Sequence, residues 1–155
     1  MQAQHTKTIT DIFIDRGLLH RLHTETVPVD LYRFHETTDL PHGRFPLHPV
    51  LEPYAIAPNR MRSADIQREE INGIMYVIAG TGGVSLFSGV APFKKPGVHL
   101  KLPVGTPITV GLVISEDNLN RIFGHIHYTI HPRITMAEFH FLFLLRRFTA
   151  FARPI

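Results

Sequence analysis

The histidine-rich segment 125–131 is the first place where the sequence could support chemistry. It reads HIHYTIH, and because strand side chains alternate between faces, His125, His127 and His131 are expected on one face. Two histidines at this spacing could share a metal ion, but no nearby aspartate or glutamate completes a typical site. We therefore interpret these histidines as polar residues that line a site or as partly exposed positions of a sheet. Near a phosphate, their imidazoles could also serve as acid or base.

A glycine-rich segment, GTGGVS at residues 80–85, is a second candidate. Glycine has no Cβ, so a ligand can approach the backbone closely, and successive N–H groups can form an anion-binding nest. The segment matches neither the full dinucleotide-binding fingerprint nor a phosphate loop with its lysine. An ordinary tight turn therefore stays open as the alternative.

Arg33 is a third candidate, because it lies on an otherwise apolar strand predicted over 29–35. Alternation places Leu31, Arg33 and His35 on one face of this strand. A permanently charged guanidinium there needs a carboxylate, a phosphate or solvent as its partner. Arg33 could hold a pyrophosphate, or it could be an edge-strand arginine paired with a surface carboxylate.

Composition limits the protein that must position these residues. A chain of 155 residues with 44% hydrophobic content predicts one domain with one core. There are no cysteines, so neither disulfides nor a thiolate zinc site can hold the fold together. The net charge of +3 favours an anionic partner, but the charges are scattered, which argues against a dedicated nucleic-acid surface.

Neither end of the chain predicts contact with a membrane. The N-terminal segment carries Asp11 and Asp15 and lacks the long apolar run of a secretory signal. The most apolar stretch, 139–145, meets Arg146 and Arg147 well before the roughly 20 residues that span a bilayer. We expect a core helix there, with part of its surface available to a partner protein.

Local patterns predict many short strands followed by one late helix. Strands are expected at 29–35, 73–79, 98–102, 108–114 and 125–130, a strand or helix start at 84–87, and a helix at 136–152. Between them we expect a helical face at Leu18, Leu19 and Leu22 interrupted at Gly17, an irregular proline-rich segment at 37–62, a polar turn at 65–72, and a polar connector at 115–120. This order predicts a single α+β domain with a mixed or mainly antiparallel sheet.

Several segments, taken together and in order, resemble the cytotoxic type VI secretion exported effector two family. They are LYR at 31–33, GIMY at 73–76, TGGVSLF at 81–87, LPVGT at 102–106, and HYTI at 127–130 with Pro132 and Met136. The resemblance covers about residues 29–150, so residues 1–28 are expected to be an N-terminal extension and 29–155 the toxin domain. It implies a fold like that of NAD-binding ADP-ribosyltransferase toxins of the diphtheria toxin type.

The resemblance also implies roles for individual residues. Arg33 would hold a phosphate or ribose of NAD. The second motif, beside the nicotinamide ribose, would consist of Thr81, Gly82, Gly83 and Ser85. Tyr128 and His127 would line the cleft from a later strand, a role that rests more on strand geometry than on the motif. In place of a catalytic glutamate, Arg33, Ser85 and His127 could polarise the bond that breaks.

Two positions depart from the family pattern. The family often has threonine where this chain has Val84, so one hydroxyl is absent. No motif identifies the catalytic glutamate of ordinary ADP-ribosyltransferases, for which Glu116 and Glu138 are the candidates.

The leading hypothesis is a toxin that acts in the cytoplasm, cleaves the nicotinamide–ribose bond of NAD, and transfers ADP-ribose to a macromolecule or to water. The alternatives are a metal-independent ribonuclease that uses Arg33, His127 and Tyr128, and a toxin that only binds a host protein. Delivery by a type VI secretion system and neutralisation by a small acidic immunity protein are further expectations.

Overall fold

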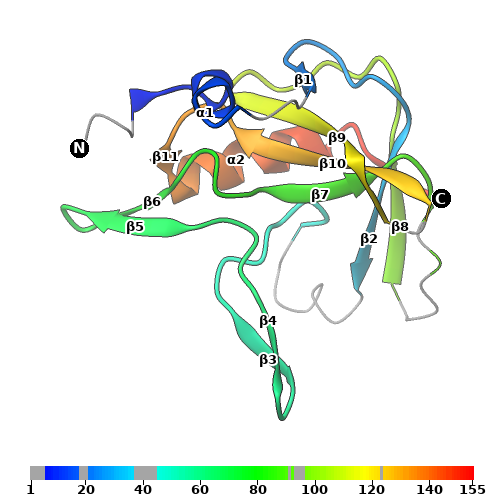
Figure 1. Cartoon of the computed structure of the whole chain (residues 1–155). Helices are drawn as coiled ribbons and strands as arrows, with labels where there is room; N and C mark the ends of the chain where they lie inside the picture. Colours follow the sequence, from blue (N-terminus) through cyan, green and yellow to red (C-terminus); the bar gives the residue numbers. More distant parts are fainter. Residues whose placement is uncertain (1–5, 18–20, 37–44, 91, 93–96, 123) are drawn as a thin grey trace.

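The largest element of the fold is a seven-stranded sheet in which every neighbouring pair of strands is antiparallel. The computed structural model describes residues 6–17, 21–36, 45–90, 92, 97–122 and 124–155. In spatial order the strands are β1 (Arg21–His23), β9 (Leu112–Ile122), β10 (His125–Pro132), β7 (Val84–Phe87), β2 (Leu31–Glu36), β8 (Gly97–Leu102) and β12 (Arg153–Pro154) (Figure 1). The three strands that carry the candidate residues, β2, β7 and β10, are therefore neighbours.

Two small sheets accompany the large one. The first contains β5 (Arg68–Ile71), β6 (Ile74–Val77) and β11 (Met136–Ala137), and the second is a hairpin of β3 (Tyr54–Ala57) and β4 (Arg60–Arg62). The β3–β4 hairpin projects away from the rest of the molecule in Figure 1. It forms the last part of the proline-rich segment 37–62 and is followed by the turn that precedes β5.

Helix α2 (Glu138–Thr149) covers one face of the large sheet. Its buried residues recur at helical spacing and form one stripe: Phe141, Leu144, Leu145 and Phe148. They belong to the same core cluster as Leu86, Tyr128 and Ile130 of the sheet. Burying a phenylalanine stabilises the fold by about 2–3 kcal/mol, so this helix contributes much of the core.

Helix α1 (Ile9–Asp15) packs on the opposite face of the sheet. Thr8 caps its N-terminus by accepting a hydrogen bond from the Asp11 N–H at 3.2 Å. Its buried residues Ile9 and Phe13 contact Val113, whose neighbours in β9 point toward α2. The 1–28 segment therefore contributes two elements to the domain: α1 packs on the large sheet, and β1 is an edge strand of it.

The chain is a small single-domain α+β protein with mostly antiparallel sheets, which confirms the predicted class. The predicted strands at 29–35, 73–79, 98–102 and 125–130 are present as β2, β6, β8 and β10, and residues 84–87 form a strand rather than a helix start. The helix expected from Met136 begins at Glu138, because Met136 and Ala137 pair with β6.

Three other expectations about local structure were wrong. The polar turn at 65–72 contains β5, because Asn72 (φ 51°) and Gly73 (φ 82°) form a two-residue hairpin turn that pairs it with β6. The strand expected at 108–114 begins at Leu112 and continues through the predicted connector 115–120, since β9 bonds to strands on both sides. The segment expected to be irregular, 37–62, contains the β3–β4 hairpin, and its residues 37–44 lie outside the described residues.

The N-terminal expectations can be followed only in part. Helix α1 ends at Asp15, and Gly17 adopts a positive φ of 66° beyond it, as expected of an interrupting glycine. Leu18 and Leu19 lie outside the described residues. In the described ranges, no helix combines the length and hydrophobicity needed to cross a bilayer.

Candidate functional site

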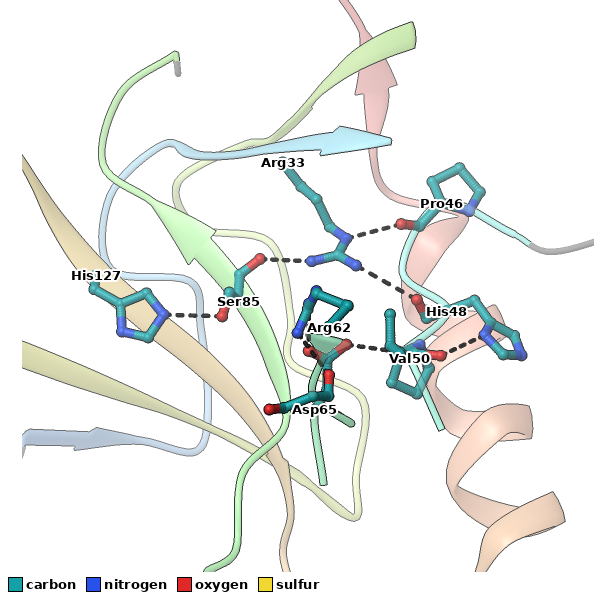
Figure 2. A network of polar contacts seen from close by, with 10 residues as sticks. Arg33, Pro46, His48, Val50, Arg62, Asp65, Ser85 and His127 are labelled. Atoms are coloured by element: carbon teal, nitrogen blue, oxygen red, sulfur yellow. Dashed lines mark hydrogen bonds and ion pairs between the residues drawn. The ribbon is translucent and has the colours of Figure 1, made fainter. Parts of the chain in front are cut away.

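Ser85 and His127 form a side-chain pair on neighbouring strands. The Oγ atom of Ser85 lies 2.9 Å from Nε2 of His127, within hydrogen-bonding distance (Figure 2). In β7 the flanking Val84 and Leu86 are buried under α2, so Ser85 projects from the opposite face of the sheet. Both members of the pair are partly exposed, which leaves a hydroxyl and an imidazole accessible together.

Arg33 approaches the same serine from the α2 side. It stands opposite the buried Leu100 in the β2–β8 register, and its Nη1 donates to the Ser85 carbonyl at 2.9 Å. Its Nε donates to the Pro46 carbonyl at 2.9 Å, and its Nη2 lies 3.4 Å from the His48 carbonyl (Figure 2). The guanidinium thus joins β2 to β7 and to the proline-rich segment through backbone carbonyls. Sequence reasoning did not predict this role.

The proline-rich segment is held by a second polar connection. Asp65 accepts a hydrogen bond from the Val50 N–H at 2.6 Å through Oδ2, and its own N–H donates to the Val50 carbonyl at 2.7 Å. Arg62 donates to the other carboxylate oxygen of Asp65 at 2.8 Å (Figure 2). Sequence reasoning missed Asp65, although an aspartate in a turn often hydrogen-bonds nearby backbone in this way.

The glycine-rich turn is packed against the protein's own backbone. A Cβ on Gly82 (φ 142°) would lie 2.0 Å from the Asp65 carbonyl oxygen, and one on Gly83 would lie 2.0 Å from the Ile130 carbonyl oxygen. The Thr81 hydroxyl donates to the Ile78 carbonyl at 2.7 Å and accepts from the Gln67 N–H at 3.0 Å. These contacts support the reading of residues 80–83 as a tight turn that positions Ser85.

Aromatic side chains surround the Ser85–His127 pair on its face of the sheet. The register of β2, β7 and β8 places on this face Tyr32, Phe34, Phe87 and His99, all partly exposed. The Phe87 ring lies 5.6 Å from the His127 ring, and the Phe34 ring 5.0 Å from the His99 ring, between centroids. Flat heterocycles stack well on such rings. In the sequence, Tyr32 and Phe34 alternate with Leu31 and Arg33. This alternation could have predicted an aromatic face on the strand.

Tyr128 is not brought together with this pair. It stands opposite Leu86 in the register and lies in the α2-side core, 2% exposed. Burial, reinforced by the neighbouring Glu116 carboxylate, raises the pKa of Tyr128 to about 12. Glu116 also lies 3.2 Å from Nε2 of His23, so this candidate glutamate belongs to the opposite face from Ser85.

The other candidate glutamate forms an ion pair at the start of α2. Glu138 accepts a hydrogen bond from Arg68 at 2.7 Å, and Arg68 also contacts Glu52 at 3.1 Å. Hydrogen bonding to Glu138 raises the pKa of Arg68. Glu138 therefore joins α2 to β5.

The three histidines of β10 have different surroundings. His131 is buried, lies 2.7 Å from the Ser115 hydroxyl through Nε2, and packs edge-on against Phe13. His125 lies beside Gly89, where an added Cβ would come within 2.2 Å of its ring. Across the described residues, no group of three histidine, aspartate or glutamate side chains is placed to hold a metal ion.

Comparison of the chain with known protein families and with curated proteins finds no match.

Proposed function

We propose that this protein is a cytotoxic effector with an ADP-ribosyltransferase-like fold that cleaves the nicotinamide–ribose bond of NAD. The observation that carries the proposal is the convergence of three motif residues on one point. Arg33, Ser85 and His127 come from three separate strands, and Arg33 and His127 each contact Ser85 at 2.9 Å. In place of a catalytic glutamate, the same three residues would polarise the bond that breaks.

The chemistry requires a surface for the nicotinamide ring and polar groups at the ribose. Phe87 and the adjacent aromatic residues offer a stacking surface beside the Ser85–His127 pair. In the reaction the glycosidic C–N bond breaks and its electron pair leaves on nicotinamide. An acceptor oxygen or nitrogen then bonds to the same carbon and gives its proton to His127 as general base.

Arg33 acts in this scheme as a positioning residue. Its bond to the Ser85 carbonyl and its bonds to the proline-rich segment hold the strand that presents the hydroxyl. Such fixed dipoles stabilise developing charge without reorganising during the reaction. The antiparallel α+β architecture with a C-terminal helix agrees with the fold that the resemblance implies.

The direct test is release of nicotinamide from NAD by the purified protein, alone and with a cell extract that supplies acceptors. We expect release by the wild-type chain and a loss of about 100-fold or more in Ser85→Ala and His127→Gln. Ser63→Ala is the matched control, because Ser63 is exposed and its hydrogen bond from Arg62 is accepted by the backbone carbonyl, which alanine retains. Absence of nicotinamide release in both settings would refute the NAD reaction.

A second candidate is a toxin that acts by binding a host protein without turnover. Two observations favour it. Gly82 and Gly83, in the turn before Ser85, pack against the chain's own backbone, and Arg33 donates hydrogen bonds to carbonyls of the chain. On this alternative, growth inhibition persists in Ser85→Ala and no nicotinamide is released. Degradation of RNA in the same extract would instead identify the ribonuclease alternative, with His127 as its base.

The proposed effector also requires a partner that silences it in the producing cell. We propose a small acidic immunity protein, since the chain carries a net charge of +3. Calorimetry with the product of the neighbouring gene tests this, and no detectable heat of binding would refute it. Delivery by a type VI secretion system belongs to the same proposal.

A further inference from the structure

Helix α2 carries a second stripe, of phenylalanines and arginines, on the side that faces away from the sheet. Its members recur at helical spacing and are exposed: Phe139, Phe143, Arg146, Arg147 and Ala150. The two phenylalanines are 71% and 54% exposed. A helix whose buried stripe is already complete has no need of large aromatic residues on its outer side.

The stripe continues into a cavity at the C-terminal end of the helix. The cavity has a volume of about 650 Å³ and lies between α2 and the loop 107–110. Its walls include Val110 and Phe151, which are 87% and 46% exposed. Gly111 permits this arrangement, because a Cβ there would lie 2.7 Å from a methyl carbon of Leu144. The surface is therefore a ridge of aromatic residues beside a hollow that can receive a side chain.

Among the described residues, the charged side chains of this stripe are both positive. Arg147 lines the cavity and lies over the Phe143 ring at 5.8 Å, while Arg146 lies over the Phe45 ring at 5.0 Å. Within the described part of the chain, neither arginine is within ion-pair distance of a carboxylate. A second copy of the chain placed symmetrically here would bring like charges together, whereas carboxylates of a partner would complete them.

We propose that this outer face of α2 is a docking surface for an acidic partner protein, which lays an amphipathic helix along Phe139 and Phe143. An apolar side chain of the partner would enter the cavity beside Val110, and its acidic residues would pair with Arg147. The surface lies on the far side of the sheet from Ser85 and His127. Occupation of this surface is thus independent of the proposed NAD site.

A synthetic amphipathic helix that contains tryptophan tests the proposal. Its fluorescence can be followed without background, because the chain itself contains no tryptophan. The probe is a peptide of leucine, alanine and glutamate with one tryptophan on its apolar face, and the matched peptide has lysine in place of glutamate. We expect saturable binding of the acidic peptide to the wild-type chain, seen as a blue shift of tryptophan fluorescence. Phe143→Ser should weaken binding at least tenfold, and Arg147→Gln should weaken it and reduce its salt dependence.

Ile14→Ser is the control, since Ile14 is also strongly exposed, at 69%, but lies on α1 at the opposite face. It should leave binding unchanged. The proposal is overturned if the lysine peptide binds as well as the acidic one, or if Phe143→Ser binds like the wild type. It is also overturned if sedimentation shows a dimer of the chain that Phe143→Ser dissociates, because the occupant would then be a second copy.

Discussion

His127 and Arg33 reach the same residue, Ser85, from opposite faces of one sheet. The imidazole lies 2.9 Å from the serine hydroxyl, and the guanidinium donates to the serine carbonyl at 2.9 Å. The first contact is partly exposed and able to meet a ligand, while the second is tied into the backbone of the proline-rich segment. The two residues should therefore respond differently to mutation.

Removing the hydroxyl or the imidazole should abolish toxicity without unfolding the protein. On induced expression at matched soluble protein level, we expect Ser85→Ala and His127→Gln to restore growth, with melting temperatures within a few degrees of the wild type. Growth curves and thermal unfolding measure the two properties. Full toxicity in both folded variants would remove the catalytic interpretation of the pair.

Arg33→Lys should lower stability, because an ammonium group cannot reproduce the fork of donors that contacts Ser85 and Pro46. We expect a loss of about 2–3 kcal/mol in the free energy of unfolding, measured by urea denaturation. Arg153→Lys, at an exposed edge strand, should change stability by less than about 0.5 kcal/mol. If the two variants were equally stable, the bonds to the carbonyls would carry little energy.

Gly83→Ala should be among the most damaging small changes in the chain. The added methyl group would lie 2.0 Å from the Ile130 carbonyl oxygen, so β7 and β10 would have to separate. We expect a loss of more than about 3 kcal/mol, or no folded protein. Gly105→Ala is the comparison, because its Cβ meets nothing and only its positive φ adds strain of about 1 kcal/mol. Equal losses in the two variants would contradict this account.

Alkaline pH should destabilise the wild-type chain through Tyr128. Its pKa is about 12 in the folded protein, against about 10 when unfolded. The unfolded state therefore loses the proton first, so the contribution of Tyr128 to stability is complete below pH 10 and is lost between about pH 10 and pH 12. We expect the loss to be on the order of 2 kcal/mol in urea titrations. Tyr128→Phe should lack this step, and the same slope in both proteins would contradict the assignment.

Local pattern was sufficient for much of the fold. Local patterns predicted strands at 29–35 and 98–102 and a helix at 136–152, because the side-chain period of each element depends only on its own geometry. The same rule places His127 and Tyr128 on opposite faces, and it could have separated them before the structure was known. The Asn72–Gly73 turn was also readable as a hairpin.

The tertiary structure decided which distant groups meet. Strand β9 contains the polar run 115–120 because it bonds to β1 and β10 on its two sides, an arrangement no local pattern specifies. Arg33 donates to the backbone carbonyls of residues 46, 48 and 85, and carbonyls are the same in every residue type. The sequence by itself determined the chemistry of the side chains and the period of each element. Their convergence on Ser85 depended on strand order, which is set by non-local pairing.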